Sequence, residues 1–392
     1  MIVPLIDADA DTSGGKAAPL GVLLRAGLPV PDGFVVPFDA HRAAARGQSL
    51  PAGLLDALGR GLHGLGDPPV AVRSSAADED SGTASAAGQH ESVLAVFGAS
   101  AVGDAVRSCW ASLHSPRARS YRDARGRGHS STEPAMAVLV QRLVDADVAG
   151  VMFTPTHPRD TVEIEASWGL GPSVAGGTVT PDRYTVHGDG SVTTTVADKR
   201  TRLDRRGTAL VTHDVPPADR RRPVLDDATA RGLAQLGHQV SALLGSPQDI
   251  EWAIAGGDVW LVQSRPITAA LPAPATLPTA PAATPTTLTG TPGSFGNATG
   301  SARTVRGPHD FPRVHAGDIL ICPYTDPSWT PLLRIAAGVV TETGGLLSHA
   351  AIVARERNIP AVLGITNATA RINDAATVTI DGAAGTVTIT SP

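Results

Sequence analysis

The chain has 392 residues, a net charge of −5 and a hydrophobic fraction of 42%, which suits two or three domains with cores of their own and gives no electrostatic reason to expect nucleic acid as a partner. No apolar run reaches the length of a membrane span, and the first residues do not show a basic segment followed by an apolar one. The two cysteines, Cys109 and Cys322, offer neither a disulfide framework nor a paired metal-binding spacing, so we expect a cytoplasmic protein that does not associate with membranes.

The N-terminal two thirds of the chain mix helical and strand patterns. Apolar residues three and four apart predict helices over 15–26 and 227–244. The pattern at 162–165 alternates, which is typical of an edge or half-buried strand. Further strands are predicted at 34–36, 70–72, 135–144 and 148–153, and a β-hairpin at 250–254 and 259–262.

A segment rich in proline, alanine and threonine follows. No charged residue occurs between Arg265 and Arg303, so this stretch has little with which to build a core. We expect a semi-extended linker over 269–292, which could reach on the order of 60 Å at about 3.1 Å per residue. It separates an N-terminal domain, 1–268, from a C-terminal domain, 293–392.

The C-terminal domain shows strands and helices in alternation, which predicts a small α/β domain with helices packed on a sheet. The expected helices are 329–336 and 348–357, and the expected strands are 318–322, 338–341, 361–363, 378–380 and 387–389.

The segment before the second of these helices carries a candidate catalytic residue. Gly344 and Gly345 follow a predicted strand, and His349 stands where the helix begins. Glycines permit a tight turn with exposed backbone N–H groups, and a helix N-terminus favours phosphate. A neutral imidazole there could attack phosphorus and hold a phosphoryl group. A capping or structural histidine is the alternative interpretation.

Two cationic residues in the N-terminal domain could bind phosphate. Arg73 ends a predicted strand and is followed by small and hydroxyl-bearing residues, a pattern that suits a polyphosphate clamp but also an ordinary flexible loop. Lys16 follows two glycines, although the segment is not a Walker A loop, because Ala17 stands where that motif has Ser or Thr. Lys16 could reach a phosphate as a point charge, or it could be exposed to solvent.

The predicted hairpin contributes a third cluster. Glu251, Gln263 and Arg265 can lie near one another across paired strands. A carboxylate and an amide oxygen suit Mg²⁺, so Glu251 and Gln263 are its candidate ligands. Charge pairing within the hairpin is the alternative. Lys199, one of only two lysines in the chain, receives no role from the sequence.

Taken together and in this order, the motifs resemble those of the phosphoenolpyruvate synthase / pyruvate phosphate dikinase superfamily, which includes rifampin phosphotransferases. The resemblance covers nearly the whole chain outside the linker. The stretch from Thr341 to Glu356 is similar to the phosphohistidine signature of that family. The other similar segments are Ser13-Gly14-Gly15-Lys16, the residues from Pro31 to Phe34, those from Ala166 to Tyr184, and Val262 to Ile267.

The resemblance implies an α/β and α+β multidomain protein, with an ATP-grasp nucleotide-binding domain of two subdomains and a small swivelling α/β phosphohistidine domain. It implies ATP and Mg²⁺ as cofactors and His349 as the phosphoryl carrier. The residues that it implies in contact with ATP or its Mg²⁺ are Lys16, Arg73, Gly88, Ser92, Gln141, Glu251, Gln263 and Arg265. In this chemistry His349 attacks the β-phosphorus of ATP, AMP and then phosphate leave, and the remaining phosphoryl group passes to an acceptor.

The acceptor side of the resemblance is open. Phosphoenolpyruvate synthases have a further barrel for pyruvate, and rifampin phosphotransferases have an antibiotic-binding domain between the two parts. Neither is recognisable in this sequence. The acceptor is expected to be a small molecule, in specialised or antibiotic metabolism. The alternatives are one half of a split phosphoenolpyruvate synthase, a phosphohistidine carrier that acts on a partner protein, and an ATP-grasp ligase that would not need His349.

Overall fold

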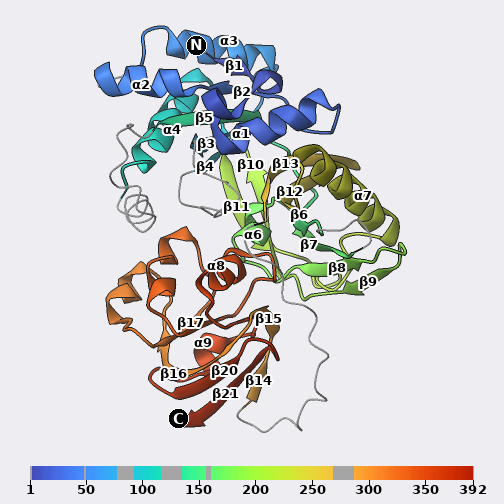
Figure 1. Ribbon diagram of the computed structural model, residues 1–392, viewed down its shortest axis with the longest axis vertical. Helices are drawn as coiled ribbons and strands as arrows, with labels where there is room; N and C mark the ends of the chain where they lie inside the picture. Colours follow the sequence, from blue (N-terminus) through green and yellow to red (C-terminus); the bar gives the residue numbers. More distant parts are fainter. Residues whose placement is uncertain are drawn as a thin grey trace.

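The computed structural model describes residues 2–47, 50–76, 92–115, 135–155, 160–267 and 287–391. Within these residues the strands form sheets of five, two, six and eight strands. Figure 1 shows the N-terminal part, in blue to yellow, above the C-terminal part, in orange and red. None of the helices in this described part of the chain is long and apolar enough to cross a membrane.

The first sheet has five strands in the order β1-β2-β5-β3-β4, and each neighbouring pair is antiparallel. Its strands are β1 (Val3–Pro4), β2 (Gly33–Val36), β3 (Val70–Ala76), β4 (Ser92–Val96) and β5 (Met136–Arg142). The helices of this part are η1 (Leu5–Asp7), α1 (Ala10–Arg25), α2 (Phe38–Gly47), α3 (Leu54–Gly64) and α4 (Ala99–Ser112). Leu58 of α3 and Val106 of α4 pack in one buried cluster with Val138 of β5.

The second sheet has six antiparallel strands in the order β13-β12-β6-β7-β8-β9. Its strands are β6 (Val148–Phe153), β7 (Val162–Trp168), β8 (Asp182–Val186), β9 (Val192–Thr195), β12 (Gln248–Ala255) and β13 (Asp258–Pro266). The other elements of this part are α6 (Pro172–Ala175), β10 (Thr201–Arg206), β11 (Ala209–Asp214) and α7 (Asp227–Leu244). Leu233 and Val240 of α7 pack on one face of the sheet with Met152 and Ile250.

Helix α1 joins the two sheets into one body. Its Leu20 and Leu23 belong to the same buried cluster as Leu139 of the first sheet and Leu261 of the second. The edge-strand interpretation of 162–165 is wrong: β7 lies between β6 and β8, and Glu165 is only 2% exposed. The pattern alternates because Glu163 and Glu165 point to the opposite face of the sheet from Val162 and Ile164, and other parts of the chain cover this second face as well.

The third sheet has eight strands in the order β14-β21-β20-β16-β17-β18-β19-β15, and the four consecutive strands β16 to β19 are parallel. Its strands are β14 (Thr287–Thr289), β15 (Thr291–Ser294), β16 (Asn297–Thr304), β17 (Ile319–Cys322), β18 (Gly338–Thr341), β19 (Ala361–Leu363), β20 (Thr377–Asp381) and β21 (Thr386–Ser391). The helices are η2 (Pro308–Arg313), η3 (Pro327–Trp329), η4 (Leu332–Arg334), α8 (His349–Arg357) and α9 (Ala368–Arg371). Ala351 of α8 packs on one face of the sheet, and Ala368 of α9 packs on the other.

Two expectations for this part need correction. The helix expected over 329–336 is replaced by the short 3-10 helices η3 and η4. Pro331 lies between them and cannot donate the backbone hydrogen bond of a continuous α-helix. The linker expected over 269–292 is also too long, because residues 287–289 and 291–292 lie in β14 and β15, which pair with β21 and β19. The rest of the expected linker, up to residue 286, falls outside the described residues.

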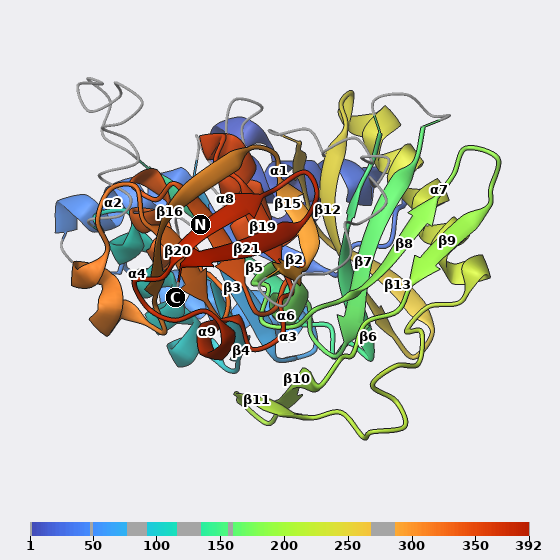
Figure 2. The same ribbon diagram turned by 90° about the horizontal axis from the view of Figure 1, so that it is seen from below.

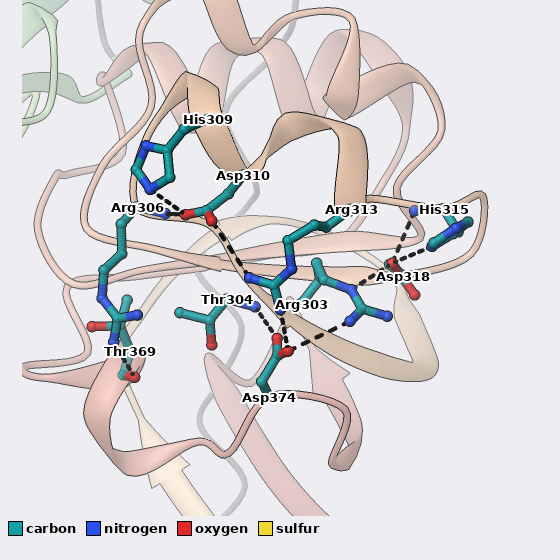
Figure 3. A network of polar contacts seen from close by, with 10 residues as sticks. All are labelled: Arg303, Thr304, Arg306, His309, Asp310, Arg313, His315, Asp318, Thr369 and Asp374. Atoms are coloured by element: carbon teal, nitrogen blue, oxygen red, sulfur yellow. Dashed lines mark hydrogen bonds and ion pairs between the residues drawn. The ribbon is translucent and has the colours of Figure 1, made fainter.

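Aspartates tie the loop around η2 to the third sheet (Figure 3). Asp374 accepts a hydrogen bond from the Thr304 backbone N–H at 2.9 Å and one from Arg313 Nη2 at 2.5 Å. Asp318 accepts one from Arg303 Nε at 3.1 Å, and Asp310 accepts one from the Arg306 backbone N–H at 2.8 Å. The C-terminal part therefore has a polar network of its own, in addition to its two apolar clusters.

Candidate active site

A pocket lies between the first and second sheets. Polar groups enter it from both sides, with Arg73 from β3, Gln141 from β5 and Glu251 from β12. The rest of the lining is largely apolar and includes Ala71, Leu94, Leu143, Val144, Ala149, Leu170, Trp252 and Val262. An apolar pocket with a few convergent polar groups is the usual form of a site for a small organic ligand.

Arg73 connects the two sheets inside this pocket. Its Nη2 donates to Glu251 Oε2 at 3.0 Å, and its Nη1 donates to the Val262 carbonyl oxygen at 2.8 Å. Its buried Nε has no hydrogen-bond partner within the described residues. Arginine binds phosphate oxygens well, so this geometry fits a polyphosphate. The structure thus brings together Arg73 and Glu251, which the sequence placed in separate motifs.

Lys16 is held beside β3. A solvent-exposed Lys16 is ruled out, because this residue is only 8% exposed and its Nζ donates to the Ser74 carbonyl oxygen at 3.1 Å. Ser75 Oγ fixes the turn that leads into Lys16. It donates to the Ser13 carbonyl oxygen at 2.7 Å and accepts from the Lys16 backbone N–H at 3.1 Å. Gly14 has a φ of 80°, and a Cβ there would lie 2.3 Å from the Ser75 carbonyl oxygen. The glycine is therefore required for this close approach.

The hairpin places Glu251 directly opposite Gln263. Arg265 lies opposite Asp249, whose Oδ2 accepts hydrogen bonds from Arg265 Nε at 2.8 Å and Nη2 at 2.7 Å. The expected cluster therefore has a fourth member, Asp249. Asp249 is not among the residues predicted from the sequence, although its place two residues before Glu251 on one strand puts both on the same face.

Glu251 and Gln263 fit the expected Mg²⁺, because a carboxylate and an amide stand as direct partners in register across the hairpin and so point to one face of the sheet. The site is not an all-carboxylate or histidine cage: no group of three or more His, Cys, Asp or Glu side chains gathers within the described residues. Mg²⁺ commonly takes few protein ligands and fills its coordination with water and phosphate oxygens, so one acidic ligand is enough for a site of this kind.

The remaining candidates have different surroundings. Gln141 is buried and lines the pocket. Its Nε2 donates to the carbonyl oxygen of Pro31 at 3.0 Å, within the family-like segment 31–34. Ser92 is exposed at the start of β4 and pairs in register with Arg73. Gly88 lies outside the described residues.

We expect Glu251→Gln to lower the rate of AMP formation from Mg·ATP by roughly 10- to 100-fold, because a hydrogen bond to a charged group contributes about 1.5–3 kcal/mol. The change removes the charge that holds Arg73 and the acidic candidate ligand of Mg²⁺. Asp258→Asn, in the exposed turn of the same hairpin, is the matched control and should retain wild-type rates. An unchanged rate in Glu251→Gln would show that the nucleotide binds elsewhere.

His349 is the first residue of α8 and is 5% exposed. Its Nδ1 lies 2.9 Å from the hydroxyl oxygen of Thr325, which is buried in the loop after β17. With Nδ1 protonated and donating to Thr325, the lone pair is on Nε2, the form that a nucleophile at Nε2 requires. The residue at the N-cap position is Ser348, so His349 does not cap the helix.

Thr325 is not among the predicted site residues, and nothing in its spacing to His349 points to it. The two come together because β17 and β18 are parallel neighbours, whose following loops leave from the same edge of the sheet.

Loss of the Thr325 hydroxyl should impair the histidine without removing it. We expect Thr325→Val to slow phosphorylation of His349 by about tenfold, as for a net hydrogen bond of about 1–1.5 kcal/mol. Single-turnover labelling with Mg·ATP measures this rate, and Thr325→Ser should restore most of it. If both variants react at the wild-type rate, Thr325 does not set the orientation of His349.

The loop that precedes His349 is docked on the second sheet. Figure 1 shows α8, the helix that follows this loop, close to α6, and Figure 2 shows the same elements from below. Glu165 of β7 accepts hydrogen bonds from the backbone N–H groups of Leu346, at 2.6 Å, and Leu347, at 3.0 Å. Thr343 Oγ1 donates to the Gly177 carbonyl oxygen at 2.7 Å. Apolar side chains from both parts close this contact: Val151, Phe153, Val174, Val179, Leu346, Leu347 and Ile352.

Two buried ionisable groups, one from each part, influence each other's pKa in this contact. Burial raises the pKa of Glu165 to about 7, although the two N–H groups of the loop and the charges of Arg183 and Arg355 lower it. Burial lowers the pKa of Arg355 to about 10, and the charges of Glu165 and Asp249 partly offset this. The guanidinium of Arg355 lies 6.0 Å from the ring centre of Phe153.

The docked loop and the candidate magnesium ligands occupy one face of the second sheet. Glu165, Val151, Glu251 and Gln263 are successive partners in register across β7, β6, β12 and β13. Side chains of residues that are direct partners point to the same face. Glu165 is two strands from Glu251, a separation of about 10 Å at about 4.8 Å per strand.

Comparisons with known proteins identify the families of the two parts. A family model described as pyruvate phosphate dikinase, AMP/ATP-binding domain, matches residues 42–277, and one described as PEP-utilising enzyme, mobile domain, matches residues 314–385. A probable phosphoenolpyruvate synthase of Methanothermobacter thermautotrophicus is 38% identical over 97% of this chain and 61% of its own length. A probable phosphoenolpyruvate synthase of Archaeoglobus fulgidus is 36% identical over 97% of this chain and 56% of its own length. The phosphoenolpyruvate synthase of Pyrococcus furiosus is 40% identical over 81% of this chain and 40% of its own length.

The chain thus spans between 40% and 61% of the length of these relatives. The matches confirm the resemblance seen in the sequence and the expected fold class, a mixed α/β protein with a nucleotide-binding part and a small mobile domain. The chain belongs to the pyruvate phosphate dikinase / phosphoenolpyruvate synthase family and contains its ATP-binding domain followed by its mobile domain.

Proposed function

We propose that the chain is a dikinase-type phosphotransferase in which ATP phosphorylates His349 and phospho-His349 passes the phosphoryl group to a small-molecule acceptor. The observation that carries the proposal is the shared sheet face. The loop before His349 is docked on β7, in the same cross-strand row as Glu251 and Gln263. A histidine held beside a candidate triphosphate site is arranged for attack on phosphorus.

In the proposed reaction, Nε2 of His349 forms a bond to the β-phosphorus while the bond from that phosphorus to the α-phosphate oxygen breaks, and AMP leaves. Hydrolysis of the remaining β–γ bridge releases phosphate and leaves one phosphoryl group on His349. Lys16, Arg73 and Arg265 would neutralise the triphosphate, and Glu251 and Gln263 would hold Mg²⁺, which supplies further charge neutralisation when bound. Positioning and electrostatic stabilisation carry most of the catalysis in phosphoryl transfer.

The names of the relatives support pyruvate as the acceptor, with this chain as the ATP and phosphohistidine half of a split phosphoenolpyruvate synthase. In that case a partner protein would supply the acceptor site. Transfer of the phosphoryl group to a partner protein itself is the other alternative. The requirement for ATP supports a cytoplasmic location.

Intact mass measurement after incubation with Mg·ATP tests the proposal. We expect an acid-labile gain of one or two phosphates, with AMP as the nucleotide product. Addition of pyruvate should remove the label if pyruvate is the acceptor. No mass gain, together with ADP in place of AMP, would overturn the proposal and favour an ATP-grasp ligase.

A further inference from the structure

Glu165 is a buried carboxylate for which the proposed chemistry has no use. It belongs to the ATP-binding part, and both of its oxygens face the mobile domain, where they accept the backbone N–H groups of Leu346 and Leu347. Each oxygen therefore contacts the short loop that leads into His349. When Glu165 is ionised, these are charge-assisted hydrogen bonds, which are stronger than bonds between neutral groups.

The loop is shaped to receive this carboxylate. A Cβ at Gly345 would lie 2.3 Å from Glu165 Oε1 and 2.4 Å from Oε2, so the position has no room for any side chain. Gly344, with a φ of 103°, sets the turn before it and donates its N–H to the Val179 carbonyl oxygen at 3.1 Å. The glycine pair thus serves the docking contact as well as the turn.

The contact joins two parts that have separate apolar cores. Beside Glu165, the mobile domain contributes Arg355, whose Nη1 donates to the Gly293 carbonyl oxygen at 3.2 Å. The attraction between Glu165 and Arg355 acts only while the two parts are together. Both side chains are buried in the docked arrangement, with Glu165 2% and Arg355 9% exposed.

We propose that Glu165 is a positioning residue that holds the loop of His349 against the ATP site during phosphorylation by ATP. The inference rests on the proposed function. Because the bonds exist only in the docked arrangement, Glu165 acts on the transfer from ATP to His349 and has no part in the later transfer to the acceptor. Its loss should affect the rate of phosphorylation and leave ATP binding intact.

Glu165→Ala tests this, with Glu163→Gln as the matched control. Glu163 lies two residues away on the same strand, and its carboxylate is bonded within its own domain to Thr185 at 3.0 Å. In Glu165→Ala we expect the single-turnover rate of His349 phosphorylation by Mg·ATP to fall at least about tenfold, since two buried N–H groups lose their partners. The KM for ATP should change less than about twofold, as for an interaction absent from substrate binding.

Hydrogen exchange of the segment 344–350 without nucleotide gives a readout that does not depend on activity. Protection of the Leu346 and Leu347 amides should fall in Glu165→Ala and remain in Glu163→Gln. If the wild-type protein forms no phosphohistidine, the proposed function fails while this contact can still be measured. If the wild-type protein is phosphorylated and Glu165→Ala reacts at the same rate with unchanged protection, the positioning role is overturned.

Gly345→Ala provides a second route, should Glu165→Ala fold poorly. Its methyl group would displace the carboxylate, so the same tenfold or larger loss of rate is expected, again with intact ATP binding. Combining Gly345→Ala with Glu165→Ala removes the clash, so the double variant should react no more slowly than Glu165→Ala alone. Effects that multiply in the double variant would show that the two residues act independently and would contradict the proposal.

Discussion

His349→Ala is expected to abolish ATP-dependent phosphorylation of the chain. The imidazole is the only group that we assign to form a bond with phosphorus, and alanine offers no nucleophile. Neither the mass gain nor AMP formation should remain above background. His349→Asn should behave in the same way, because an amide can keep a contact with Thr325 but cannot hold a phosphoryl group.

The matched control is His315→Ala. His315 lies on the same domain, is exposed, and contributes its backbone N–H to Asp318 at 2.9 Å, a bond that alanine retains. This variant should be phosphorylated at the wild-type rate. A phosphate gain that persists in His349→Ala would place the carrier on another residue.

Asp182→Ala is expected to cause the largest loss of stability. Asp182 and Lys199 are both 0% exposed, and Lys199 Nζ donates to Asp182 Oδ1 at 2.6 Å. Asp182 also accepts the backbone N–H groups of Ala197, at 2.8 Å, and Val224, at 3.0 Å. Removal of the carboxylate leaves a buried ammonium without its charge partner, which costs about 3–5 kcal/mol.

Urea unfolding of the ATP-binding part measures this loss. The double variant Asp182→Leu/Lys199→Met, which removes both charges, should be more stable than Asp182→Ala, because an apolar pair of similar volume needs no charge compensation. A loss below about 1 kcal/mol in Asp182→Ala would contradict the structural role of the pair. The sequence left the role of Lys199 open. Through its contact with Asp182, Lys199 attaches the segment before β10 to strand β8.

Local elements were predictable because their signal is local. The expected bounds of β6, α7, β18 and β19 agree with the structure, since apolar periodicity and short β-branched runs report on neighbours in the chain. The helix expected over 329–336 does not form, because Pro331 interrupts it and apolar periodicity takes no account of a proline. The sequence predicts a linker where β14 and β15 lie, because the strands that pair with them, β21 and β19, are far away in the chain and leave no local signal.

In the candidate site, too, contacts between residues far apart in the chain could not be predicted from the sequence. Motif order and family resemblance were enough to single out His349, Arg73 and Glu251. The contact between Arg73 and Glu251 spans 178 residues, and that between Glu165 and Leu346 spans 181. Such pairs depend on strand register and on how the mobile domain docks, and neither has a signature in a single sequence.

The burial of His349 has a kinetic consequence. In the docked arrangement the residue is 5% exposed, and its neighbours Leu346, Leu347 and Ile352 pack against the ATP-binding part. In the proposed reaction, an acceptor that needs the same face of the mobile domain would compete with docking, so the two half-reactions would alternate. Steady-state kinetics with ATP and the acceptor should be of the ping-pong type, with parallel lines in double-reciprocal plots and inhibition by high acceptor concentration that ATP relieves.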